Sequence, residues 1–168
     1  GTRGIALLVD RDTPYKLRHV FDYSDTNSRA GRVVTLWQMR PQYEEAVKES
    51  LQDSFGEVEL TADFPHFLME IAKNAVEDNF SDYLSSLQAV KGDSFLEELD
   101  DLNLEAWLKD TLRSSVAYMA LVRAGYQPSL YFTRDDFSHI YDFNTVPVIS
   151  VLGAATSDIS EMVIREIA

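Results

Sequence analysis

Residues 64–87 read FPHFLMEIAKNAVEDNFSDYLSSL and decide the fold class. Their apolar members recur every three or four positions, which is typical of one buried face of an α-helix. Thr61 or Asp63 can cap the start of such a helix, Pro65 suits its first turn, and Gly92 lies beyond its end. The pattern predicts one long amphipathic helix with an apolar stripe made of Phe64, Phe67, Leu68, Ile71, Ala72, Ala75, Phe80, Tyr83, Leu84 and Leu87.

Helical periodicity continues on both sides of this stretch. A four-residue repeat after Pro41 predicts a helix that ends at Gly56, with Tyr43, Val47, Leu51 and Phe55 on its apolar face. Residues 103–125 predict a second helix, capped by Asn103 and closed by Gly125. Its apolar residues are Leu104, Trp107, Leu108, Leu112, Val116, Met119, Ala120 and Val122.

Two shorter helices are expected from capping signals. Ser94 and Glu97 have the spacing of a capping box, which predicts a short acidic helix. Thr133 and Asp136 predict another short helix, through Tyr141.

The C-terminal end of the chain predicts a final helix. It starts near Thr145 and Pro147 and runs to Ala168, with an expected break near Gly153 or Ser157.

The N-terminal part, up to Arg40, differs because it favours β-structure. Residues 4–10 form a short apolar run, and residues 17–23 alternate apolar and polar side chains across a polar turn at residues 11–14. Residues 33–39 can add a third strand. The fold class we expect is therefore α+β and mostly α: an N-terminal β-hairpin and loop over residues 1–40, followed by a helical bundle over residues 41–168.

Composition excludes several classes of function. The chain has 168 residues, a net charge of −13 and no cysteine, which excludes disulfides and thiolate metal sites. The negative charge argues against direct nucleic-acid binding, which needs a positive field. No apolar run approaches a membrane span, and the run GIALLV at residues 4–9 is too short for a signal peptide. We expect a cytoplasmic protein with no membrane partner, and the opening Gly1 suits a piece of a larger polypeptide.

Few residues offer chemistry. His19, His66 and His139 lack the spacing of metal ligands, so we expect no metal and no cofactor. Ser138 and Asp142 flank His139, but a catalytic triad is normally assembled from distant segments. The densest acidic run consists of Glu97, Glu98, Asp100, Asp101 and Glu105. A solvated helix face explains this run, and a patch for a basic partner is the alternative, because the run lacks the ligand spacing of a calcium loop.

Six strings together resemble a region of very large proteins on conjugative elements of Firmicutes, which are polyvalent fusions with DNA methylase and helicase modules. The strings are GIALLVD at 4–10, RHVFDYSDT at 18–26, SFLEELDD at 94–101, SSVAYMALVRAGYQP at 114–128, DFSHIYDFNT at 136–145 and SDISEMVIREI at 157–167. That region resembles the ArdC and LtrC-like antirestriction family, in which a DNA-binding domain precedes a zincin-like metallopeptidase domain. The resemblance implies that residues 1–40 are the tail of a preceding DNA-binding domain.

The resemblance also implies where a zinc site would lie. An active member would carry HEIAH on one helix and a Glu in an ESVAY-like segment, because two His at i and i+4 and a later Glu hold the ion. This chain has Met69 and Lys73 in place of the two His and Ser114 in place of the Glu, and only Glu70 matches. A thioether, an ammonium and a hydroxyl cannot form a zinc site. We therefore expect a degenerate site, with the two helices held side by side by apolar stripes.

These observations predict a non-catalytic scaffold or protein-interaction domain of a mobile-element DNA-processing or antirestriction protein. Its partner would be another domain of a larger polypeptide or a separate protein. Two alternatives stay open. The first is an acidic DNA mimic that occupies a restriction enzyme, which the charge of −13 permits. The second is a hydrolase with an unrecognised site.

Overall fold

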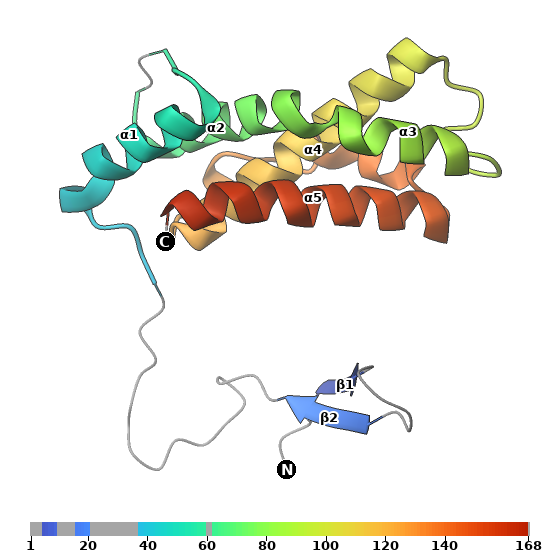
Figure 1. Cartoon of the computed structure of the whole chain (residues 1–168), viewed down its shortest axis with the longest axis horizontal. Helices are drawn as coiled ribbons and strands as arrows, with labels where there is room; N and C mark the ends of the chain where they lie inside the picture. Colours follow the sequence, from blue (N-terminus) through green and yellow to red (C-terminus); the bar gives the residue numbers. More distant parts are fainter. Residues whose placement is uncertain (1–4, 10–15, 21–36, 60–61, 168) are drawn as a thin grey trace. The chain divides into compact units, whose positions relative to one another are not determined.

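The computed structural model describes residues 5–9, 16–20, 37–59 and 62–167, which fall into two units, Gly1–Leu36 and Trp37–Ala168 (Figure 1). In the first unit, β1 (Ile5–Val9) pairs antiparallel with β2 (Lys16–Val20). Ile5 lies opposite Val20, and Val9 lies opposite Lys16, as in a hairpin. The expected turn at 11–14 and most of the expected third strand at 33–39 lie outside the described residues, and residues 37–39 are irregular.

The second unit is built from helices, so the predicted fold class, α+β and mostly α, is confirmed. The short 3-10 helices pack against α1 and α4. The elements are η2 (Pro41–Tyr43), α1 (Glu44–Phe55), α2 (Phe64–Asn79), α3 (Ser81–Val90), α4 (Asp101–Arg123), η3 (Pro128–Leu130), η4 (Asp135–Asp142) and α5 (Val146–Ile167).

The core lies where α2, α4 and α5 pack against one another, with α1 and α3 covering its ends (Figure 1). The expected apolar stripes of α2 and α4 are buried: Leu68, Ile71, Ala72 and Ala75 on one helix and Leu112, Val116 and Ala120 on the other. Met119, which we also placed in this interface, is 45% exposed, so that assignment was wrong. The expected side-by-side packing of these two helices is therefore held by apolar contacts.

The long helix predicted over residues 64–87 is divided into α2 and α3. Asp63 caps α2, because its carboxylate accepts a hydrogen bond from the backbone N–H of His66 at 3.0 Å. The division falls at Phe80, directly after Asn79, whose side-chain amide donates to the carbonyl of Ala75 at 2.8 Å. Asn is a poor helix former because its side chain competes for backbone groups, and such back-bonding bends helices.

The short acidic helix predicted from Ser94 and Glu97 is absent, because residues 91–99 form turns. Some of their backbone N–H groups donate to backbone carbonyls and others to side chains: the Ser94 hydroxyl accepts from Leu96, and the Glu97 carboxylate accepts from Asp93. The next helix, α4, begins before the predicted cap at Asn103. Its cap is Asp100, whose carboxylate accepts from the backbone N–H of Asn103 at 2.9 Å.

The C-terminal helix α5 has no break at Gly153 or Ser157. Its buried residues recur every three to four positions and face the core: Val148, Leu152, Ala155, Ile159, Ser160, Val163 and Ile167. We expected no segment that approaches a membrane span, yet α5 meets the length and composition test, with a mean hydropathy of 1.3 in its most apolar window. The core helix of a soluble protein passes the same test.

Candidate functional site

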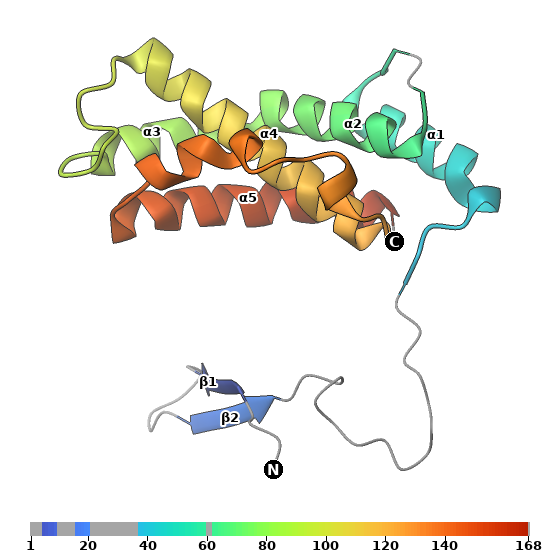
Figure 2. The ribbon, with the colours of Figure 1, turned by 180° about the vertical axis from the view of Figure 1, so that it is seen from behind.

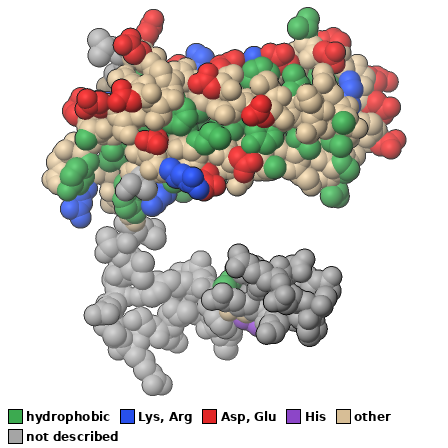
Figure 3. Space-filling model, in the orientation of Figure 1, with side chains coloured by type: hydrophobic (Ala, Val, Ile, Leu, Met, Phe, Trp, Pro, Cys, Tyr) green, Lys and Arg blue, Asp and Glu red, His purple; other side chains and the backbone are tan. Residues whose placement is uncertain are grey.

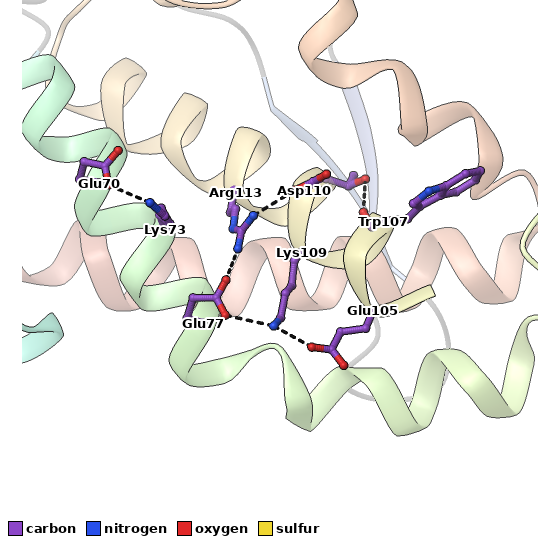
Figure 4. Close-up of polar contacts among 9 residues, drawn as sticks. Glu70, Lys73, Glu77, Glu105, Trp107, Lys109, Asp110 and Arg113 are labelled. Atoms are coloured by element: carbon purple, nitrogen blue, oxygen red, sulfur yellow. Dashed lines mark hydrogen bonds and ion pairs between the residues drawn. The ribbon is translucent and has the colours of Figure 1, made fainter. Parts of the chain in front are cut away.

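The residues at the expected degenerate zinc site come from two helices, α2 and α4. Met69 packs against the core, and Lys73 is exposed, with its ammonium 3.2 Å from the carboxylate of Glu70 (Figure 4). Lys73 therefore reaches both solvent and a carboxylate. Ser114 of α4 lines a hollow against η4.

Contacts between α2 and α4 fix how these positions align. Glu77 of α2 pairs with Arg113, the neighbour of Ser114 in α4. Glu77 lies one turn beyond Lys73 on α2, so this pair joins the two helices next to the expected site. The structure pairs Glu70 with Lys73, and Ser114 lines the hollow against η4.

A network of charges joins α2 to α4 beside this region (Figure 4). Glu77 accepts from Arg113 and from Lys109, whose ammonium lies 3.1 Å away. Lys109 also pairs with Glu105 at 2.7 Å, and Arg113 pairs with Asp110 at 3.0 Å. Burial alone would raise the pKa of Glu77, but the hydrogen bonds from Arg113 and Lys109 outweigh it and lower that pKa. The network thus holds the two helices in register with ionised groups.

The acidic run is engaged mostly in local structure. Glu97 accepts from the backbone of Asp93, Asp100 caps α4, Asp101 accepts from Gln88, and Glu105 pairs with Lys109. The fifth member, Glu98, is exposed. Four of the five carboxylates therefore have roles in holding turns and helix ends, which favours the interpretation as a solvated structural segment.

A polar hollow of about 320 Å³ lies between α4 and η4. His139 lines it, stacks on Trp107 with ring centroids 4.4 Å apart, and lies 3.4 Å from the carboxylate of Asp142. In the described part of the chain, no hydrogen bond joins Ser138 to His139, so the three neighbours do not form a nucleophile–base pair. The other lining residues include Asp110, Ser114, Asp135 and Asp136.

A mostly apolar hollow, a groove of about 590 Å³, lies between α4 and α5. Figure 2 shows α4 crossing α5 obliquely, and η4 packs against α4. The groove is lined by Ser115 and Met119 of α4, by Ile140 of η4 and by one face of α5. That face consists of Ile149, Leu152, Gly153, Thr156, Ser157, Ser160, Glu161 and Ile164.

Exposed apolar side chains surround this groove. Met119 is 45% exposed and Ile149 is 42% exposed, and Val122 lies one helical turn beyond Met119 with 50% exposed. Small residues form part of the floor, and a Cβ atom added at Gly153 would meet no atom within 4 Å. The groove is therefore open, apolar and shallow enough for a helix to approach closely.

Sequence patterns did not reveal the groove, because its two walls come from helices that are far apart in the chain. The only local signal was Met119, an apolar residue at the edge of the predicted stripe that we assigned to the core.

Among the described residues, no three His, Asp or Glu side chains lie close enough together to hold a metal ion. Compared with known protein families, with curated proteins and with solved structures, the chain matches none.

Proposed function

We propose that this chain is a non-catalytic protein-interaction module that binds an α-helix of a partner in the groove between α4 and α5. The observation that carries the proposal is the groove itself, an apolar channel lined in part by exposed Met119 and Ile149. Docking a helix by its apolar face into such a groove is a recurring mode of peptide recognition. The resemblance to antirestriction proteins supports a setting in a mobile-element DNA-processing protein.

The groove has the dimensions that this mode needs. Its α5 wall runs from Ile149 to Ile164, which is about 22 Å of helix. Small residues such as Gly153 and Ser157 in this wall allow the close approach of about 8–10 Å between helix axes. A partner helix of about 18 residues would bury its apolar stripe along the whole wall.

Selection from a displayed library tests the proposal. The library would carry helices of this length with a fixed Leu and Ala stripe and random outer positions, and the target would be the full chain. The blocking variant is Gly153→Leu, whose side chain enters open space and so fills the groove. The matched control is Ala154→Leu, at the next residue of α5, which is exposed and does not line the groove.

The selected helices should bind the Ala154→Leu variant like the original chain and should bind Gly153→Leu at least tenfold more weakly. Failure to bury one Leu-sized side chain costs about 1.5–3 kcal/mol, and about 1.4 kcal/mol is tenfold in Kd. A library that yields no binder, or binders that ignore Gly153→Leu, would refute the groove as the binding site.

The acidic DNA mimic is a second candidate, and the charge of the helical unit favours it. Residues 37–168 hold 24 Asp and Glu against 9 Lys and Arg, a net charge of −15. Figure 3 shows Asp and Glu side chains distributed over one face of this unit. A DNA mimic would bind a basic DNA-handling enzyme with an affinity that falls steeply with salt and would not respond to Gly153→Leu.

A further inference from the structure

The helical unit uses its basic groups internally, which leaves its surface strongly acidic. Five of its nine Lys and Arg side chains form ion pairs with carboxylates of the same unit, and Arg123 stacks on Trp37. These ion pairs engage six of the 24 carboxylates in residues 37–168: Glu45, Glu70, Glu77, Glu105, Asp110 and Glu161. A field of this sign raises the local concentration of basic partners.

Acidic side chains also line the polar hollow next to the groove. Consecutive residues of α4 line the groove and the hollow, Ser115 and Ser114 respectively, so the two are neighbours. In the hollow, Asp110 pairs with Arg113, whereas Asp135 and Asp136 are exposed. A cationic side chain that projects from the groove toward the hollow would meet these exposed carboxylates.

We infer that the occupant of the groove is a basic amphipathic helix, with an apolar stripe for the groove and Lys or Arg at one end, next to the hollow. The inference rests on the proposed function and specifies the partner's chemistry. Apolar burial along α5 would supply most of the affinity. The carboxylates of the hollow would set the direction in which the helix lies and speed its association.

The same charges disfavour the other occupants of an exposed apolar groove. A second copy of this chain would bring together two units of −15 each. A nucleic acid or an anionic lipid surface would meet the same repulsion. A basic protein helix is the occupant to which both the apolar groove and the acidic hollow beside it are complementary.

Three synthetic helices, each long enough to span the α5 wall, test the inference on the full chain. They share one Leu stripe and differ only at one end, which carries three Lys, three Gln or three Glu. Fluorescence anisotropy would give each Kd at low and at physiological salt. The protein variants are Asp135→Asn at the hollow and Glu98→Gln, an exposed acidic control outside both hollows.

The Lys helix should bind most tightly and the Glu helix most weakly, with the differences shrinking as salt rises. Asp135→Asn should weaken the Lys helix by about two- to fivefold, the range of one exposed charge pair, and leave the Gln helix unchanged. Glu98→Gln should change neither.

Equal affinities for the three helices, with binding still lost in Gly153→Leu, would overturn the basic-partner inference and leave the groove's function standing. A preference for the Lys helix that Glu98→Gln reduces as much as Asp135→Asn would also overturn it, because the attraction would then be general. If no helix binds, or if Gly153→Leu weakens the binding of none of them, the proposed function itself is overturned.

Discussion

The charge network between α2 and α4 should stabilise the protein, and Glu77→Gln tests this directly. The substitution keeps the shape of the side chain and removes the charge that both Lys109 and Arg113 contact. Each cation retains a second carboxylate, Glu105 for Lys109 and Asp110 for Arg113, so the variant leaves no isolated buried charge. The fold should therefore survive, and the free energy of unfolding can be measured.

Glu77→Gln should lower the free energy of unfolding by about 1–2 kcal/mol, a value that lies between two limits. Exposed ion pairs contribute about 0.2–1 kcal/mol each, and hydrogen bonds to charged groups contribute about 1.5–3 kcal/mol. The side chains here are partly buried, with exposed fractions of 18% for Lys109, 34% for Arg113 and 37% for Glu77, so a value between these limits applies. For a chain of this length the loss lowers Tm by about 3–8 °C.

Urea unfolding at pH 7 followed by circular dichroism would measure the loss, with Glu70→Gln as the matched control. The Glu70–Lys73 pair lies within α2 at 3.2 Å with both side chains about half exposed, so its loss should cost about 0.5 kcal/mol or less. Because the folded state lowers the pKa of Glu77, its stabilisation is complete above the ordinary value of 4.5 and is lost as pH falls through the lowered pKa. Equal losses for the two variants at pH 7, or a Glu77→Gln effect that persists in strong acid, would refute the reasoning.

Three further results are expected. Ser160→Ala should leave the free energy of unfolding unchanged or raise it by about 1 kcal/mol, because the described part of the chain gives the buried Ser160 hydroxyl no partner. A lower free energy of unfolding, measured in urea, would contradict this. Burial and a hydrogen bond to Asp158 raise the pKa of Tyr83 to about 12. A pH titration of phenolate absorbance should therefore show one tyrosine that ionises at higher pH than the others and that Tyr83→Phe removes. An unchanged titration curve in that variant would contradict this prediction. The variant Met69→His, Lys73→His, Ser114→Glu restores all three zinc ligands and should give no stoichiometric zinc by elemental analysis, because Met69 packs against the core and Ser114 lines a hollow to which α2 contributes no residue. One tightly held zinc per chain would reverse that conclusion.

Periodicity predicted the helices well where an apolar stripe faces the core. Most residues of the expected stripes of α2 and α4 are buried, because a repeat of three to four residues marks the face that packs on the core, whereas Met119 and Val122 of α4 are exposed. It could not locate the division at Phe80, since the stripe continues through it and only the side chain of Asn79 marks the bend. Periodicity also could not distinguish turns from a helix at residues 94–99, where side chains accept some of the backbone hydrogen bonds.

The candidate site was less predictable than the fold, for a physical reason. A groove forms where two helices diverge, and divergence depends on what each helix packs against elsewhere. Ser115 and Met119 read as parts of an ordinary amphipathic helix, and Gly153 read as a break. Only their joint position beside η4 makes them the wall and floor of one channel.

Aspartates make the starts of α2 and α4, and the turn that leads into η4, respond together to acid. Asp63 begins α2, Asp100 begins α4, and Asp136 accepts from Thr133 at the start of the η4 segment. In each case the leading cause, a backbone hydrogen bond, lowers the pKa of the carboxyl, so the caps hold above the ordinary value and are lost as pH falls below it. Acid should therefore open these starts locally while the apolar core stays closed, and fraying would begin at both helices that carry the charge network.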